Sequence, residues 1–170
     1  MDLQEAFISC RVAENSQEIL TVNTFKGLYR FSRLAYGLKV ASAIFQRTMD
    51  ALLRGIPGVQ CFVDDVLVTG KDDAEHLRNL EKVLKIFADN GLRVRKEKCK
   101  WMQDRVKYLG HVIDGEGLHM IDEKVKAVQD APAPKDVTQL KSFLGLVNYY
   151  TCFLGNLSTV LKPMYELLKK

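Results

Sequence analysis

The stretch Val59–Thr69 reads V-Q-C-F-V-D-D-V-L-V-T, and the interpretation of the whole chain depends on it. Two β-rich runs, Val59–Val63 and Val66–Thr69, flank the polar pair Asp64-Asp65. Two short apolar runs around two polar residues predict a β-hairpin whose turn is the aspartate pair. Adjacent carboxylates repel each other, and a divalent cation would remove that repulsion and use both groups. Aspartate is also a common turn residue, so the pair alone leaves a structural role open.

The segment before this hairpin predicts a mixture of strands and helices. Residues 2–12 are short and ambiguous, and fit one helical face after a strand that ends at Asp2. The runs Ile19–Thr24 and Leu28–Leu34 predict a second hairpin, since Phe25-Lys26-Gly27 separates them as a turn. Lys39–Arg54 has apolar residues at helical spacing and stops at Gly55-Ile56-Pro57, which predicts a helix.

The segment after the hairpin begins with the clearest helix, from Asp72 to Asn90. Asp72-x-x-Glu75 resembles a capping box, and Gly91 ends the helix. Its predicted apolar stripe is Leu77, Leu80, Leu84 and Phe87. Short strands are then predicted at Leu92–Val94, Val106–Leu109 and His111–Ile113, with a turn at Gly115-Glu116-Gly117. This part is interpreted as a basic β-hairpin.

The composition changes after that turn, and the remaining chain is predicted to be all helical. A short helix is expected at Ile121–Gln129, followed by the stiff connector Ala131-Pro132-Ala133-Pro134. Asp136-x-x-Gln139 opens another helix, and a last helix runs from about Thr159 to Lys169. The apolar face of the middle helix is Val137, Leu140, Leu144 and Val147.

Composition and charge place the chain among ordinary globular proteins, with 170 residues of which 47% are apolar and 27% charged. No apolar run approaches the ~20 residues that span a bilayer, and the first residues do not resemble a secretory signal. The four scattered cysteines predict a reduced, intracellular protein. Between Leu92 and Gly110, seven basic and two acidic residues give a local charge of +5. This segment is either a solvated surface or a contact for phosphates.

The predicted order of elements is that of a polymerase palm, and the chain resembles the reverse transcriptase of gypsy-type LTR retrotransposons. The similar stretches cover nearly the whole chain in the same order. They are D-L-Q-E-A-F (2–7), K-G-L-Y-R-F-S-R-L (26–34), A-I-F-Q-R-T-M-D (43–50), F-V-D-D-V-L-V-T (62–69), E-H-L-R-N-L-E-K-V-L (75–84), G-L-R-V-R-K-E-K-C (91–99), Y-L-G-H-V-I-D (108–114) and S-F-L-G-L-V-N-Y-Y (142–150).

The resemblance implies an α+β fold and a catalytic function. It implies a palm, with an antiparallel sheet and helices on one face, over residues 1–115, and a fingers hairpin at about residues 19–34. A helical thumb-like or connection-like region is implied over residues 116–170. Asp2, Asp64 and Asp65 are implied to be the catalytic residues and the ligands of two Mg²⁺ ions, for which Mn²⁺ is a possible substitute. Three carboxylates suit a two-metal nucleotidyl transfer, and Asp2 should then lie close to the aspartate pair.

The resemblance also implies contacts with substrates. The expected partners are dNTPs and an RNA or DNA template with its primer, and a ribonuclease H domain is expected downstream. Phe7 lies where the family has an aromatic residue that crowds the sugar 2′ position. The expected nucleotide-binding residues are Phe7, Tyr36, Gln46 and Lys98. The expected nucleic-acid-binding residues are Arg93, Arg95, Lys107, Tyr108, Gly110 and His111, of which the last three belong to the primer-grip motif Tyr108-Leu109-Gly110-His111.

Several departures from the family pattern keep other functions open. The prolines of the nucleotide-side loop are replaced by Ala35 and Ser42, and the tyrosine of Y-x-D-D is Phe62. Cys152 and Gly155 stand where the family has Arg and Pro. The residues that grip the triphosphate in the family precede Met1, so little polymerase activity is expected of residues 1–170 alone. The alternatives are a catalytically inactive remnant that at most binds nucleic acid, or part of a polyprotein known for ribonuclease H activity.

Overall fold

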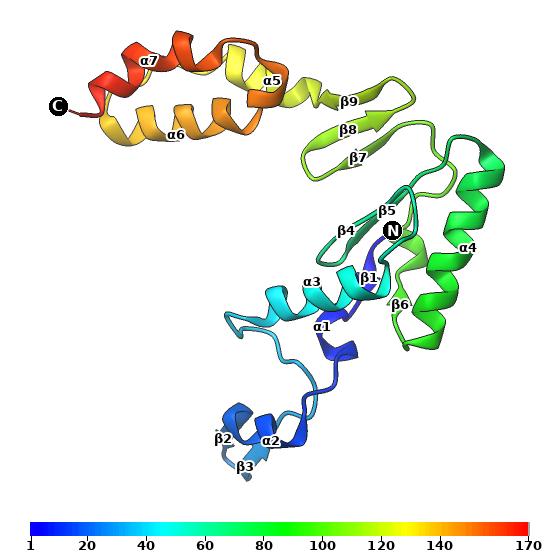
Figure 1. Cartoon of the computed structure of the whole chain (residues 1–170). Helices are drawn as coiled ribbons and strands as arrows, with labels where there is room; N and C mark the ends of the chain where they lie inside the picture. The colour runs from blue at the N-terminus through cyan, green and yellow to red at the C-terminus, as the bar shows by residue number, and fades with distance from the viewer. Residues whose placement is uncertain (170) are drawn as a thin grey trace. The chain divides into compact units, whose positions relative to one another are not determined.

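In the computed structural model, which describes residues 1–169, the chain divides into two compact units (Figure 1). The first unit is Met1–Trp101, and the second begins at Met102. The strands and the helices of residues 106–167 therefore belong to one unit, whereas the sequence predicts a functional boundary at residue 115. That functional division into palm and thumb-like regions stays a prediction.

Two antiparallel ladders form the centre of the first unit. Strand β1 (Leu3–Gln4) pairs with β6 (Arg93–Val94), and β4 (Val59–Phe62) pairs with β5 (Asp65–Val68). An antiparallel bridge between Asp2 and Asp65 connects the ladders, so β1 and β5 lie side by side. The backbone bonds from Leu3 N to Asp64 O (3.0 Å) and from Val66 N to Met1 O (2.8 Å) fix this register. The sequence leaves this long-range pairing unspecified, because both strands are short.

The turn between β4 and β5 lies one residue earlier than the sequence predicts. Phe62 pairs with Asp65, so the two-residue turn consists of Val63 and Asp64. Val63 has a φ of 52°, the left-handed conformation that tight hairpin turns require. The prediction of an Asp64-Asp65 turn is wrong because Asp65 also bridges Asp2, and this third strand holds it in the ladder.

Helices α3 (Ala41–Leu52) and α4 (Asp73–Asp89) supply the core of the first unit. Phe45 and Met49 of α3 are fully buried, and Val83 and Phe87 of α4 are buried with them. The predicted α4 stripe is wrong in its first turns, because Leu77 is exposed and Asn79 is buried. The Asn79 amide donates to Thr69 O (3.0 Å), which explains why a polar residue lies on the inner face. The predicted N-cap is confirmed, since Asp72 accepts from Glu75 N (2.7 Å).

The predicted fingers hairpin is present but shorter than expected. Its strands are β2 (Thr21–Thr24) and β3 (Gly27–Arg30), and every residue in both is exposed. Residues Glu18–Leu20 form a 3₁₀ turn, and Phe31–Leu34 lie outside the hairpin. Two short helices, α1 (Ala6–Ser9) and α2 (Glu14–Gln17), precede it. Beyond Arg30 the chain leaves the hairpin and pairs instead with residues 10–12, through Val12 N to Ser32 O and Leu34 N to Cys10 O, at 3.0 Å each.

The second unit begins with a three-stranded antiparallel sheet. Its strands are β7 (Val106–Tyr108), β8 (His111–Asp114) and β9 (Gly117–Met120). Strand β9 was not predicted, because G-L-H-M contains no β-branched residue. Asp114 pairs with Gly117, so the turn is shorter than the predicted Gly115-Glu116-Gly117.

Helices α5 (Asp122–Gln129), α6 (Val137–Tyr149) and α7 (Leu157–Leu167) complete the second unit. The N-cap of α6 is confirmed, since Asp136 accepts from Gln139 N (2.8 Å), although Val137 is exposed instead of buried. Helix α7 begins before the predicted Thr159, because Leu157 packs into the core of this unit. That core consists of Leu140, Leu144, Val147, Leu157 and Leu161. Across residues 1–169, every helix is too short or too polar to cross a lipid bilayer.

Candidate functional site

The backbone brings the three predicted aspartates into one neighbourhood. Asp2 and Asp65 face each other across the bridge between β1 and β5, and Asp64 occupies the turn that precedes β5. Neighbouring residues Leu3 and Val66 are buried, each at 1% exposure. Because side chains alternate along a strand, the flanking Asp2 and Asp65 project to the face opposite these buried residues. The close approach that the sequence predicts is therefore confirmed.

The electrostatics of this neighbourhood reflect three carboxylates held close together. Desolvation raises the pKa of Asp65, and the negative charges of Asp64 and Asp2 raise it further. The α-ammonium group of Met1 acts in the opposite direction. A cation bound here would stabilise the site, because its positive charge would compensate the negative charges of all three carboxylates.

The carboxylate of Asp2 also has an oxygen atom without a hydrogen-bond partner among the described residues. Its Oδ1 atom is buried and accepts no hydrogen bond from any of residues 1–169. The nearest positive group is the Arg95 guanidinium, whose Nε lies 3.6 Å from Oδ1 and forms a long ion pair. A buried carboxylate oxygen without a hydrogen bond is costly, and a hard cation is a partner of the right chemistry.

The side chains of the three aspartates are not grouped closely enough to hold a metal ion as they stand. Among residues 1–169, no group of three or more His, Cys, Asp or Glu residues is arranged so that it could hold a metal ion. The donor set of Asp2, Asp64 and Asp65 still fits Mg²⁺, because it offers only carboxylate oxygens and includes the unsatisfied Oδ1 of Asp2.

Gln46, which the sequence predicts to bind nucleotide, bonds to the backbone of the aspartate turn. Its amide nitrogen donates to Cys61 O (2.9 Å) and to Asp50 Oδ1 (2.8 Å). Its amide oxygen accepts from Val63 N (2.7 Å). The side chain is therefore occupied by the β4–β5 turn. The A-I-F-Q stretch placed Gln46 near the site, but only the fold reveals that it contacts the turn itself.

The other predicted nucleotide-binding residues lie on the first unit. The rings of Phe7 and Tyr36 lie 5.2 Å apart, and Phe7 also packs edge-to-face on the buried Phe45 at 5.6 Å. Phe7 is half-buried, whereas Tyr36 is exposed. Lys98 lies on an exposed 3₁₀ turn, Lys96–Lys98, that follows β6.

The basic stretch Leu92–Gly110 is not one hairpin, and that prediction is wrong. Arg93 lies in β6, which pairs with β1, whereas Lys107 lies in β7, which pairs with β8 in the other unit. The runs are too far apart in sequence for a tight turn, and each finds a partner within its own unit. Arg95 is partly engaged by Asp2, and the exposed Lys107 lies 3.3 Å from Glu123.

The predicted primer-grip motif forms the tight turn between β7 and β8. Leu109 and Gly110 have φ values of 46° and 75°, and Tyr108 pairs with His111 across them. Tyr149 and Tyr150, at the end of α6, donate from their hydroxyls to Leu109 O and Gly110 O, respectively. The His111 ring stacks on Tyr149 at 5.2 Å and contacts Tyr150 and Phe153. The two tyrosines therefore fix the turn to α6, a contact that the sequence did not predict.

Replacing Gly110 by Ala is expected to disrupt this turn. A Cβ atom at Gly110 would lie 2.7 Å from Tyr149 Oη, and the φ of 75° is unfavourable for alanine. The left-handed conformation alone costs about 1–2 kcal/mol, so the second unit should unfold at a lower temperature. Gly115→Ala is the matched control, because that site is open and in the same sheet. Equal melting temperatures of both variants would contradict the prediction.

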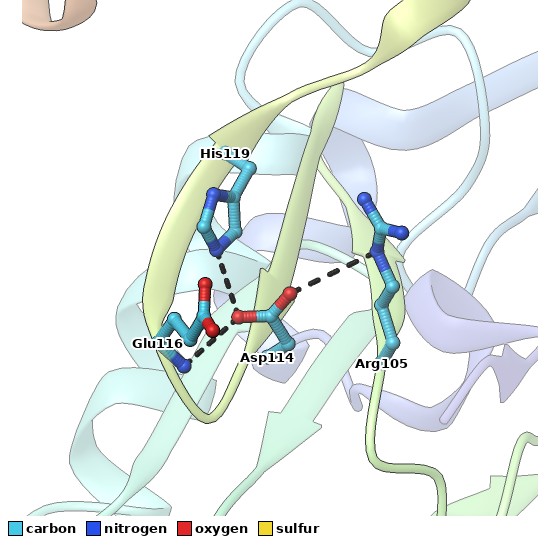
Figure 2. A network of polar contacts seen from close by, with 4 residues as sticks. All are labelled: Arg105, Asp114, Glu116 and His119. Atoms are coloured by element: carbon cyan, nitrogen blue, oxygen red, sulfur yellow. Dashed lines mark hydrogen bonds and ion pairs between the residues drawn. The ribbon is translucent and has the colours of Figure 1, made fainter.

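A polar network at the far end of β8 was also not predicted. Asp114 accepts from His119 Nε2 and from Glu116 N, at 2.8 and 2.9 Å, and lies 3.8 Å from Arg105 Nε (Figure 2). The hydrogen bond from His119 and then that from Glu116 N hold the pKa of Asp114 below its ordinary value. These contacts tie the β8–β9 turn to the segment that leads into β7. Their role is structural, since they stabilise the end of the sheet.

Comparisons with known proteins agree with this geometry. A family model described as reverse transcriptase (RNA-dependent DNA polymerase) matches residues 1–113. The Pol polyprotein of the Drosophila melanogaster transposon gypsy is 36% identical over 171 residues, which cover 99% of this chain and 16% of that polyprotein. The polyprotein of transposon opus, from the same organism, is 35% identical over 171 residues, covering 99% of this chain and 17% of the relative. The chain therefore spans under a fifth of the length of these relatives.

Solved structures show the same fold. The foamy viral protease–reverse transcriptase in complex with double-stranded DNA superimposes with a TM-score of 0.85 at 31% identity, covering 99% of this chain and 30% of that chain. The foamy viral enzyme in complex with an RNA/DNA hybrid gives a TM-score of 0.80 at 31% identity, covering 99% of this chain and 23% of that one. These similarities confirm the predicted α+β fold class.

Proposed function

The chain belongs to the reverse transcriptase family, and on that premise we propose that it carries the nucleotidyl-transfer centre of an RNA-directed DNA polymerase. The observation that supports this proposal best is the bridge between Asp2 and Asp65, which gathers the three carboxylates from distant parts of the sequence. The reaction joins a dNTP to a primer 3′-hydroxyl and releases pyrophosphate. The triphosphate of the dNTP is negatively charged, and carboxylates alone would repel it. A centre made only of carboxylates therefore needs bound cations.

The three aspartates would hold two Mg²⁺ ions, which lower the pKa of the primer hydroxyl and neutralise charge on the triphosphate. The protein's own contribution is placement. The bridge fixes Asp2 against Asp65, and the tight turn places Asp64 beside them. Arg95, which forms a long ion pair with Asp2, would orient that carboxylate before a cation binds. Such preorganisation supplies much of the catalysis in phosphoryl transfer.

The aromatic pair Phe7 and Tyr36 supports a nucleotide site on the same unit. Phe7 is held from behind by the buried Phe45, so its position is rigid. A rigid aromatic ring beside the nucleotide sugar would exclude a 2′-hydroxyl and so favour dNTPs over ribonucleotides. Lys98, on its exposed 3₁₀ turn, is proposed to contact the triphosphate through its charge.

Each unit is proposed to contact nucleic acid through basic residues of its own. The foamy viral relatives were solved in complex with double-stranded DNA and with an RNA/DNA hybrid. In this chain, the turn at Leu109-Gly110 and the neighbouring Tyr108, His111 and Lys107 would contact the primer backbone. Arg93 would contact phosphates from the first unit, where its side chain is exposed.

Neutralising basic residues is expected to flatten the salt dependence of nucleic-acid binding. Arg93 and Lys107 are exposed, and the ion pair of Lys107 with Glu123 exchanges readily with phosphate. Replacing Arg93, Arg95 and Lys107 by Gln should reduce the slope of log affinity against log salt by up to ~0.9 for each duplex DNA phosphate that the variant no longer neutralises. The control is Lys85→Gln on the exposed side of α4. An unchanged slope in the triple variant would show that these basic residues form a solvated surface and do not contact phosphates.

Mn²⁺ binding tests the proposed centre without requiring catalysis. Mn²⁺ replaces Mg²⁺ at carboxylate sites, and its electron paramagnetic resonance signal distinguishes free from bound ion. Residues 1–170 should bind Mn²⁺ saturably, Mg²⁺ should displace it, and template–primer with dNTP should strengthen the binding. Absence of saturable binding, with and without template–primer and dNTP, would contradict the proposed metal centre.

A catalytically inactive remnant is the second candidate function, and one observation favours it. No three acidic or other ligand side chains of residues 1–169 are already arranged around a metal position. In that case the basic surfaces would bind nucleic acid, and the aspartates would only stabilise the bridge. Nucleic-acid binding without Mn²⁺ binding would identify this function.

A further inference from the structure

Among the described side chains, Gln46 of α3 holds the backbone of the aspartate turn at two points. Its amide oxygen accepts from Val63 N at 2.7 Å, and its amide nitrogen donates to Cys61 O at 2.9 Å. The second amide hydrogen goes to Asp50 Oδ1 at 2.8 Å. The side chain therefore spans the backbone just before the two aspartates.

The turn requires such support because its first residue is strained. Val63 is β-branched and has a φ of 52°, a conformation that is unfavourable for L-residues other than glycine and asparagine. Its N–H group cannot pair within the two-stranded ladder, which closes at Phe62 and Asp65. Without Gln46, the turn would lose a partner for this N–H and a restraint on its strained residue.

Helix α3, which carries Gln46, is firmly packed in the core. Phe45 and Met49 of α3 are fully buried, at 0% exposure each, and anchor the helix in the core. On the other side, the Cys61 thiol donates to Val63 O at 3.3 Å, so the turn backbone is held at both polar groups of Val63. Burial raises the pKa of Cys61 to about 11, which keeps this thiol protonated and able to donate.

We propose that Gln46 is a positioning residue that sets the backbone of the Val63-Asp64 turn and thereby the placement of Asp64 and Asp65. This proposal deepens the proposed function, because the aspartates matter as ligands only if the metal centre exists. Gln46 itself touches the turn backbone and not the reacting atoms. Partners that orient metal ligands in this way typically change metal affinity by ~10–100-fold when they are removed.

The test compares Gln46→Met with Asp50→Ala in residues 1–170. Methionine matches glutamine in length and helix propensity but removes the bonds to Cys61 and Val63. Asp50→Ala removes only the outer contact of the Gln46 amide and leaves the turn bonded. Two quantities are measured: amide hydrogen exchange at Val63 by NMR, and Mn²⁺ affinity by electron paramagnetic resonance.

Gln46→Met should make the Val63 amide exchange about tenfold faster, as loss of one hydrogen bond predicts, without faster exchange in α4. It should also weaken Mn²⁺ binding by ~10–100-fold, whereas Asp50→Ala should change neither quantity by more than about twofold. Unchanged exchange at Val63 in Gln46→Met would overturn the proposal. Faster exchange with unchanged Mn²⁺ affinity would also overturn it, because the turn would then not place the ligands.

The experiment distinguishes failure of the proposed metal centre from failure of the proposed role of Gln46. If the unsubstituted chain binds no Mn²⁺, the proposed metal centre fails, while exchange at Val63 still reports whether Gln46 holds the turn. If Gln46→Met does not fold, Gln46→Glu replaces it. Glutamate keeps an acceptor for Val63 N–H but repels Asp50 and Cys61 O, so Val63 should stay protected while Mn²⁺ affinity changes. Loss of protection at Val63 in a folded Glu variant would contradict the assigned hydrogen bond.

Discussion

Replacing Asp64 by Asn is expected to lower primer extension about 1,000-fold, since metal stabilisation of the transition state is worth several kcal/mol and each 1.36 kcal/mol is tenfold in rate. The substitution keeps the size of the side chain and removes one charge from the turn. Asparagine is a weak ligand for Mg²⁺, so the loss should appear in kcat and less in the affinity for template–primer.

The measurement is made in a longer chain that contains the matching segment, the Pol polyprotein of transposon gypsy. Its matching segment is 36% identical over 171 residues and can be exchanged for residues 1–170 of this chain. The chimera should extend a primer on RNA and DNA templates in the presence of Mg²⁺. Asp89→Asn, an exposed position at the end of α4, is the matched control and should leave extension unchanged.

Three outcomes separate the candidate functions. Extension that is lost in Asp64→Asn and kept in Asp89→Asn supports a catalytic centre. A chimera that binds template–primer but never extends it supports the inactive remnant. Extension that survives Asp64→Asn at the same rate would show that Asp64 is not a catalytic ligand.

The sequence predicted the elements best where one local signal was sufficient. Helix α4 was found from its cap at Asp72, and α6 from its cap at Asp136, because both carboxylates bond to the third residue of their helices. The aspartate hairpin was found from two apolar runs. Strand β9 and the inner face of α4 were missed, because they depend on the neighbouring strand β8 and on the Asn79 bond to Thr69.

The resemblance predicts which residues form the candidate site, and their catalytic roles stay predictions, whereas the contacts that surround them were not predicted. Asp2, Asp64 and Asp65 were identified through the resemblance, since no spacing rule connects residues so far apart. The contacts of Gln46 and of the two tyrosines at the end of α6 were not predicted, because each side chain bonds to backbone atoms of a distant turn. Such bonds leave no residue pair in the sequence that would indicate them.

Replacing Asp65 by Asn is expected to change stability and metal affinity in opposite directions. Without divalent cations, the variant should be more stable at neutral pH, because Asn carries no charge to desolvate and is not repelled by Asp64 and Asp2, the causes that raise the pKa of Asp65. The gain should not exceed about 1 kcal/mol, since Asp65 is exposed and solvent screens its interactions. Mn²⁺ affinity should fall at least tenfold, by loss of a charged ligand.

The pH dependence of this stability difference follows from the sign of the pKa shift. The folded chain binds the Asp65 proton more tightly than the unfolded chain, so folding becomes less favourable as the pH rises from 3.8, the ordinary value, through the raised pKa. Well below 3.8 the carboxyl is protonated in both states and the shift contributes nothing to the pH dependence. The advantage of Asp65→Asn should therefore be smallest in acid and grow toward neutral pH.

Thermal unfolding with and without Mn²⁺ checks both halves of this prediction. In EDTA the melting temperature of Asp65→Asn should exceed that of the unsubstituted chain at pH 7, and the two should converge near pH 3. With Mn²⁺ at ~1,000 times the dissociation constant, binding stabilises the unsubstituted chain by about 4 kcal/mol and should reverse the order. A variant that is less stable in EDTA would show that Asp65 serves the fold through its own contacts. If Asp65→Asn still melts at the higher temperature in Mn²⁺, then no metal ion binds the carboxylates and compensates their repulsion.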